Sequence, residues 1–275
     1  HAILRGLGDS KTPLYFLIFS TLLNVVLDLV FVVVFSWGIE GVAWATVISQ
    51  CVAFVANALY INKKHPFIRI AFTKIGFCKK ILFQSLRIGL PTGFQQTFVA
   101  LGIMALVRIV SEFGTSAMAA YTVVTRIETF IVLPAMNLSA ALSMFVGQNI
   151  GANKASRVYK GFNFSFWANF LITIILTIIC VVFRHQIVGL FNMDPDVIKI
   201  GGEYLIIVSG FYIIFGSMFM IHGVLRGAGD TIMPMFATLF SLWIIRIPLS
   251  YLLSREIGTN GIWWGIPIAW IIGLV

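Results

Sequence analysis

The sequence predicts an all-α protein that crosses the membrane several times, and three observations support this. Hydrophobic residues make up 59% of the 275 residues and charged residues only 11%, whereas a soluble domain carries about 25% charged residues. The apolar runs are long enough for helical spans of about 20 residues and lack the alternation over about 10 residues that is typical of membrane barrels. The net charge of +9 is concentrated in a few loops, which indicates membrane topology, so no nucleic-acid partner is expected.

Short polar breaks divide the chain into eight expected spans. Thr12-Pro13 offers an N-cap followed by proline at the first helical position. The chain starts on His1 without Met and ends inside an apolar run, so we expect a longer parent protein. The expected spans are residues 12–36, 41–62, 84–111, 116–147, 161–183, 196–222, 232–254 and a truncated 259–275.

Lysine and arginine predict the orientation. Thirteen of the 19 lie in the loops before the odd-numbered spans and four in the alternate loops, so the positive-inside rule makes the first set cytoplasmic. The longest of these loops has the pattern either of an interfacial helix on an anionic leaflet or of a solvated basic connector. The predicted cytoplasmic loops are residues 1–11, 63–84, 148–160 and 223–231.

An internal repeat organises the chain. LRGLGDS at 4–10, followed by Pro13, recurs as LRGAGDT at 225–231, followed by Pro234. Six spans separate the copies, so both lie on one membrane side, and parallel repeats of this kind are typical of transporters. We expect glycine turns in which the aspartate caps the next helix or pairs with the preceding arginine. The motif residues are Arg5, Gly6, Gly8 and Asp9, and Arg226, Gly227, Gly229 and Asp230.

Both copies contain GxGD, which resembles the signature of intramembrane aspartyl proteases, in which two aspartates share a proton. Such a protease needs its aspartates within the membrane, whereas these lie in predicted loops, so this is the weakest interpretation. The three cysteines have neither metal-ligand spacing nor a disulfide framework. No HExxH, P-loop or GxSxG motif is present, so the residues do not indicate an enzyme, and no structural metal or cofactor is expected.

The first span carries two polar residues, Asn24 and Asp28, on one helical face. A carboxylate inside a membrane span is costly and by default indicates a functional site. An antiparallel neighbour can bring Thr46 to the pair, giving oxygen ligands for a proton or Na⁺. For Thr46 alone, a hydrogen bond within its own helix is the simpler interpretation.

The fourth span has a second polar stripe formed by Tyr121, Thr125 and Glu128. Glu128 is a candidate for contact with a proton or substrate, and the alternative is an ion pair with Arg246. Arg126 points roughly away from Glu128 but, like Arg246, is an in-span cation that a cavity could use.

Three other features of the spans have structural interpretations. Gln95 and Gln96 are expected to hydrogen bond between helices, with a possible place in a cavity. Prolines 134, 248 and 267 should kink their spans. Trp263 and Trp264 are expected near a membrane interface.

These residues resemble the multidrug and toxic compound extrusion (MATE) transporters, especially the DinF-like branch. The resemblance covers essentially the whole chain. The matching segments are LRGLGDSKTP at 4–13, LNVVLD at 23–28, GVAWATVISQ at 41–50, YTVVTRIETFIVLP at 121–134, VGQNIGANK at 146–154 and VLRGAGDTIMP at 224–234.

The resemblance implies two six-helix lobes in parallel repeat. Residues 1–62 would then end the first lobe, 63–84 would be the linker, and 85–275 would form the second lobe, as helices 5 to 12 in all. It also implies that Asn24, Asp28 and Thr46 belong to the first lobe's cation site, together with an aspartate that this sequence does not contain.

Some family members instead use an acidic residue in the first helix of the second lobe. Gln95 and Gln96 occupy that neighbourhood here, which favours coupling through the first lobe.

The expected function is that of a plasma-membrane antiporter that exports lipophilic or cationic compounds in exchange for H⁺ or Na⁺. Membrane lipid and small lipophilic cations are the expected partners, and the full-length form is expected to be monomeric. A flippase for lipid or lipid-linked anions is the nearest alternative, and it would need several arginines or lysines facing a cavity.

Overall fold

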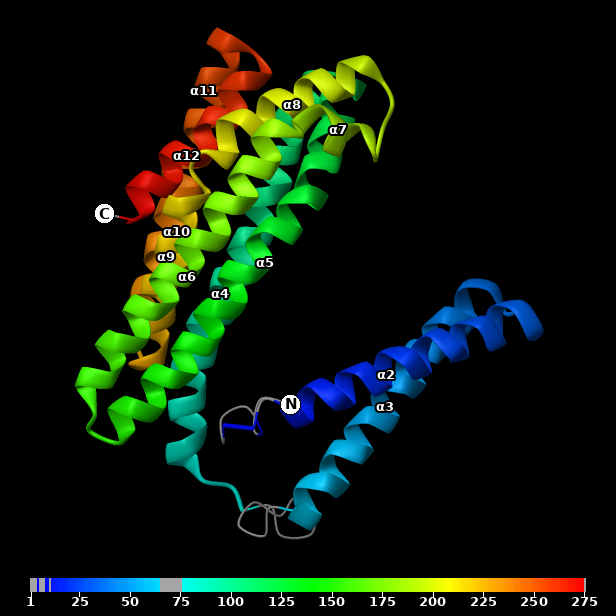
Figure 1. Cartoon of the computed structure of the whole chain (residues 1–275), viewed down its shortest axis with the longest axis vertical. Coiled ribbons are helices and arrows are strands. Elements are labelled where there is room, and N and C mark those ends of the chain that lie inside the picture. Colours follow the sequence, from blue (N-terminus) through cyan, green and yellow to red (C-terminus); the bar gives the residue numbers. More distant parts are fainter. Residues whose placement is uncertain (1–3, 5–7, 10, 65–75, 275) are drawn as a thin grey trace. The chain divides into compact units, whose positions relative to one another are not determined.

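A computed structural model describes residues 4, 8–9, 11–64 and 76–274. Within these residues the chain is helical and forms no strand. It divides into two compact units, His1–Cys78 and Lys79–Val275, which Figure 1 colours blue to cyan and cyan to red. The predicted all-α membrane fold is confirmed, with six helices long and apolar enough to span a membrane and a bent pair that makes a seventh.

The first unit is a pair of packed helices. Helix α2 (Lys11–Leu29) continues into a π-helical turn, η1 (Val30–Val34), and then packs along α3 (Gly38–Lys64). The buried residues of α3 recur every fourth position and are mostly small, which lets the two helices approach closely. They are Gly41, Ala45, Ser49, Ala53, Asn57 and Ile61.

The second unit is a bundle of helices that run side by side (Figure 1). Helix α5 packs against α4, α6, α8 and α9, and α12 packs against α8, α9, η3 and α11. The elements are α4 (Lys79–Ser111), α5 (Thr115–Gly151), α6 (Ala155–Val182), α7 (Arg184–Gly189), α8 (Pro195–Ser209), α9 (Tyr212–Gly227), α10 (Ile232–Leu239), the π-helical η3 (Phe240–Arg246), α11 (Ile247–Ile257) and α12 (Thr259–Leu274).

The predicted span over 196–222 is not one straight helix. Helices α8 and α9 meet at a 52° bend, and the Ser209-Gly210 pair at the break is a common cause of kinks. The Ser209 hydroxyl donates to the Leu205 carbonyl, and the Thr177 hydroxyl of α6 donates to the Ser209 carbonyl at 2.8 Å. A neighbouring helix therefore satisfies a backbone group freed by the break.

Several predicted boundaries shift by a few residues. The described ends of the predicted 63–84 linker are helical, because Lys63 and Lys64 end α3, and α4 begins at Lys79. Long basic side chains can extend from such helix ends toward the headgroups. Residues 65–75, which hold most of the predicted interfacial helix, lie outside the described residues, and the last expected span forms the 16-residue helix α12.

The two copies of the repeat form the same helix-ending turn. The Asp9 N–H donates to the Leu4 carbonyl at 3.0 Å, and the Asp230 N–H donates to the Leu225 carbonyl at 2.9 Å. The intervening glycines, Gly8 and Gly229, have φ of 86° and 90°, as this turn type requires.

The aspartate of each turn then caps the helix that follows. Asp230 accepts the N–H groups of Ile232 and Met233 at 3.0 and 3.1 Å, and Asp9 accepts that of Thr12 at 3.0 Å. Hydrogen bonds from Thr12 also hold the pKa of Asp9 below its ordinary value. The predicted capping role is thus present in both copies, whereas Arg5 and Gly6 lie outside the described residues.

Arg226 and Gly227 belong to the end of α9 and not to a loop, which corrects the prediction. Gly227 is needed for close packing, because a Cβ there would lie 2.4 Å from the Ser143 carbonyl oxygen of α5. Arg226 is half-buried and bonds to another helix rather than to Asp230.

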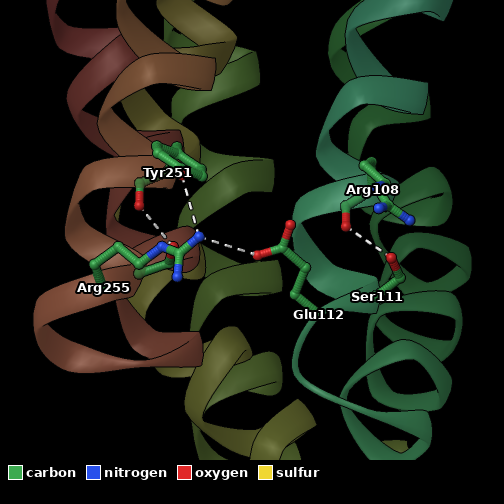
Figure 2. A network of polar contacts seen from close by, with 6 residues as sticks. Arg108, Ser111, Glu112, Tyr251 and Arg255 are labelled. Carbon is green, nitrogen blue, oxygen red and sulfur yellow. Dashed lines mark hydrogen bonds and ion pairs between the residues drawn. The ribbon is translucent and has the colours of Figure 1, made fainter.

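An exposed polar network joins the α4–α5 turn to α11, and Figure 2 shows its side chains. The Arg255 guanidinium lies 3.5 Å from the Glu112 carboxylate and donates to the Tyr251 hydroxyl at 3.1 Å. Both charged side chains are substantially exposed, so the ion pair contributes only about 0–1 kcal/mol.

Candidate functional site

Polar side chains from α2 and α3 line a cavity of about 440 Å³ within the first unit. The cavity lies along the face where small residues bring the helices together, and apolar side chains from both helices complete its wall. Its polar lining residues are Ser20, Thr21, Asn24, Thr46, Ser49, Gln50 and Asn57.

The predicted contact between Asn24 and Thr46 is present. The Asn24 side-chain amide donates to the Thr46 hydroxyl at 3.4 Å, and that hydroxyl donates to the Val42 carbonyl at 2.9 Å. Thr46 therefore makes both the contact between helices and the bond within its own helix.

Asp28 is one turn farther along α2 and does not line this cavity. Its Oδ1 atom is buried and has no hydrogen-bond partner, which is costly for a carboxylate oxygen. The π-helical turn η1 begins two residues later, and such turns are frequent at functional sites. Asp28 is 17 residues beyond Lys11, so it lies about 26 Å along the helix, toward the end of the span.

In the second unit, the predicted polar stripe of α5 lines a cavity of about 540 Å³. Tyr121, Thr125 and Glu128 face this cavity together with Arg246 from the end of η3. In the described part of the chain, Glu128 and Arg246 do not approach within the 4.0 Å of an ion pair, but their charges interact over a longer distance, so the predicted pairing stays a prediction. Arg126 is exposed and lines neither this cavity nor the adjacent one. This follows from its position two residues before Glu128, which places it about 200° around the helix, so its place in a cavity stays a prediction.

Two tyrosines that the sequence did not indicate complete this cluster. Tyr204 of α8 and Tyr212 of α9 interact with the Glu128 carboxylate, although neither buried hydroxyl meets the full geometry of a hydrogen bond. Both residues flank the α8–α9 bend, which hydropathy does not reveal. Glu128 therefore lies close to two buried tyrosine hydroxyls, one on each side of the bend in the chain.

Trp263 lies in the core and not at an interface, which corrects the sequence-based expectation. It is completely buried, stacks on Tyr121 with a 6.0 Å centroid separation, and meets Tyr204 edge-on at 4.9 Å. This aromatic cluster fixes the helices that carry the Glu128 cluster.

Gln95 joins three helices, as predicted for an interhelical hydrogen-bonding residue. Its amide donates to the Pro234 carbonyl and the Thr238 hydroxyl of α10 at 3.2 and 2.6 Å, and its carbonyl accepts from Arg226 at 3.0 Å. Gln96 is exposed and lines the adjacent cavity.

That adjacent cavity, of about 390 Å³, collects residues from α4, α5, α9, α10, η3 and α12. It shares Arg246 with the Glu128 cavity, and His222 and Arg226 also line it. Neither His222 nor Arg226 was predicted to face a cavity, because His222 is isolated in an apolar run and Arg226 was counted with a loop.

A family model described as MatE matches residues 91–252. A Bacillus subtilis protein named "Probable multidrug resistance protein YoeA" is 34% identical over 99% of this chain and 61% of its own length. The chain belongs to the MATE family. A Thermotoga maritima relative, "Probable multidrug resistance protein NorM", is 27% identical over 96% of the chain and 58% of its own length.

Solved MATE structures have the same fold. A MATE structure in the bent conformation matches with a TM-score of 0.90 at 23% identity, over 99% of this chain and 61% of the other. A mutant of the Vibrio cholerae MATE transporter VcmN matches with a TM-score of 0.91 at 20% identity, over 99% and 62%. The chain spans about three-fifths of the length of these relatives, and as a MATE chain it is part of a multi-pass membrane transporter family.

Proposed function

We propose that the protein containing this MATE chain is a secondary antiporter that exports lipophilic, often cationic compounds in exchange for H⁺ or Na⁺. Family membership and the names of the relatives support export of drugs. The observation that carries the coupling proposal is the buried Asp28 oxygen without a partner, one turn from the Asn24–Thr46 contact.

Asp28 is the proposed coupling group. An unpartnered carboxylate oxygen in a span is stabilised either by taking up a proton or by ligating a cation. Asn24 and Thr46 offer further oxygen atoms of the kind that hard cations prefer. If the Lys11 end is cytoplasmic, Asp28 lies in the outer half of the span, where external ions can reach it.

Binding of the ion at Asp28 would drive export only if it favours one conformation over the other. We infer that the occupied site favours an arrangement of α2 and α3 with lower affinity for the exported compound at the outer side. In the second unit, Glu128 and the neighbouring Tyr121 are the proposed contacts for a lipophilic cation, through charge and a ring face.

Gradient-driven dye export from membrane vesicles tests the role of Asp28. The Asp28→Asn variant keeps the shape of the side chain but cannot carry the charge, so export driven by a pH or Na⁺ gradient should fall at least about tenfold. Running the two gradients separately identifies the ion.

The matched control is Glu40→Gln, an exposed acid at the start of α3, which should export at the wild-type rate. Gradient-coupled export that is unchanged in Asp28→Asn, at equal protein levels, would remove Asp28 from the mechanism.

A further inference from the structure

The 390 Å³ cavity in the second unit is lined by positively charged side chains, which is unusual for a transporter that exports cationic drugs. Two arginines and a histidine line it, with the amides of Gln95 and Gln96, and no described lining residue is a carboxylate. Its electrostatic potential is therefore positive, which disfavours a cationic occupant.

Arg246 is the less satisfied of the two arginines. It is half-buried, its Nε atom is buried without a hydrogen-bond partner, and no ion pair forms with it in the described part of the chain. Glu128 faces the adjoining cavity, lies beyond ion-pair distance and interacts with Arg246 only across that longer separation. A half-buried guanidinium without a close partner is stabilised further by an anion brought from outside the protein.

Arg226 provides a second positive group in the lining of the cavity. It donates to Gln95, which in turn bonds to Thr238, while its own Nε is buried without a partner. Thr238 and Arg246 lie eight residues apart on one continuous helical run. Two arginines from different elements, Arg226 of α9 and Arg246 of η3, therefore line the same cavity.

Aromatic side chains form an apolar part of the cavity wall. Phe215 and Phe219 from α9 and Trp270 from α12 line the cavity, and Phe215 and Trp270 are in contact at 4.7 Å between ring centroids. Such a wall suits a hydrocarbon chain or an aromatic ring. The combination of an apolar wall and arginine side chains matches a molecule with one anionic group and an apolar body.

We propose that this cavity binds anionic amphiphiles, with a carboxylate, sulfonate or phosphate group held by Arg246 and the apolar body against Phe215, Phe219 and Trp270. As a substrate class, this rests on the proposed export function. As a binding site, it stands on the cavity alone, and it adjoins the Glu128 cavity proposed for cations, with which it shares Arg246 and three apolar lining residues.

The test uses two probes of equal length and opposite charge, 11-bromoundecanoate and (11-bromoundecyl)trimethylammonium. Bromine quenches tryptophan fluorescence on contact, and Trp270 is in the cavity wall, so quenching of the purified full-length protein in maltoside micelles reports occupancy. The anion should bind at least about tenfold more tightly than the cation, and Trp270→Phe should remove the saturable part of the quenching.

Arginine variants then locate the charged group. Arg246→Gln should weaken binding of the anion about tenfold or more, as expected for loss of a charge-assisted hydrogen bond, and leave the cation unaffected or tighter. The matched control, Arg126→Gln, removes an exposed arginine that does not line the cavity and should bind both probes as the wild type does.

A second variant avoids the buried arginine and its effect on folding. Gln96→Glu adds a carboxylate at an exposed lining position, which should weaken the anion about tenfold and tighten the cation. Equal affinities of the two probes for the wild type, or an unchanged anion affinity in Gln96→Glu, would overturn the proposal. Because no ion gradient is present, these results are independent of Asp28 and of coupled export.

Discussion

Two glycines of the recurring motif, Gly227 and Gly229, are required for different physical reasons. At Gly227 the φ angle is ordinary, but a Cβ would collide with the Ser143 carbonyl oxygen. At Gly229 a Cβ would meet no atom within 4 Å, yet φ is +90°, which penalises every residue with a side chain. Space is the constraint at the first position and backbone conformation at the second.

Alanine substitutions should separate these demands. Gly227→Ala should lower the free energy of unfolding by about 1–3 kcal/mol, because the clash is with backbone and must move a helix. Gly229→Ala should cost about 1–2 kcal/mol through the left-handed conformation alone. Thermal unfolding in detergent measures both changes.

Gly93→Ala is the control for the same chemical change. Gly93 is an exposed residue of helix α4 with open space around it, so alanine should stabilise the helix by about 0.5–1 kcal/mol. If Gly93→Ala lowered the free energy of unfolding as much as Gly227→Ala, close packing against Ser143 would not explain the effect at Gly227.

The break between α8 and α9 is the element whose irregularity affects the candidate site most directly. Tyr204 precedes it and Tyr212 follows it, so the 52° bend sets the direction from which each hydroxyl approaches Glu128. Ser209 and Gly210 produce the bend, and Thr177 holds it by donating to the Ser209 carbonyl. A straight helix would present these two tyrosines differently.

Removal of the Thr177 hydroxyl should weaken the bend. Thr177→Val leaves the Ser209 carbonyl without this donor and should cost about 1 kcal/mol in unfolding free energy. Thr122→Val is the matched control, because the Thr122 hydroxyl is exposed and bonds only within its own helix. Equal melting temperatures for the two variants would show that the Thr177 bond does not stabilise the break.

At the scale of the whole molecule, hydrogen bonds between helices that are distant in sequence add to the hydrophobic core of the second unit. Gln95 connects α4 to α9 and α10 through three hydrogen bonds, one of them from the Arg226 guanidinium. The Glu112–Arg255 ion pair, which joins the α4–α5 turn to α11, is exposed and contributes little to stability. Of these two polar connections, the buried Gln95 amide is therefore expected to contribute more to the free energy of unfolding.

Gln95→Leu should lower the free energy of unfolding by about 2–3 kcal/mol, because it leaves a half-buried guanidinium without its acceptor. The neighbouring change Gln96→Leu, at an exposed position, should alter stability by less than about 0.5 kcal/mol. Chemical unfolding followed by tryptophan fluorescence compares the two variants. Similar unfolding midpoints for both would contradict the role of Gln95 as a stabilising connection between helices.

Much of the fold could be predicted from the sequence, because span length and charge distribution are local properties. The Asn24–Thr46 contact was also predictable, since spacing along α2 and an antiparallel neighbour determine it. The inward position of Arg226 was not, because a count of loop charges cannot tell a loop arginine from one in the last helical turn. The burial of Trp263 could not be predicted either, because hydropathy does not distinguish an aromatic residue in the core from one at the membrane interface.

The π-helical turns also bear on which insertions and deletions the chain can accept. A π turn accommodates one residue more than an α turn, so η3 holds a surplus residue within the continuous run of α10, η3 and α11. Deletion of one residue within η3 would let the wide turn close to an α turn, while the helices on either side keep nearly the same orientation. The span would survive, and the change in side-chain direction would fall on the residues of η3, which include Arg246, so chain length at this point is coupled to the charge of the two cavities.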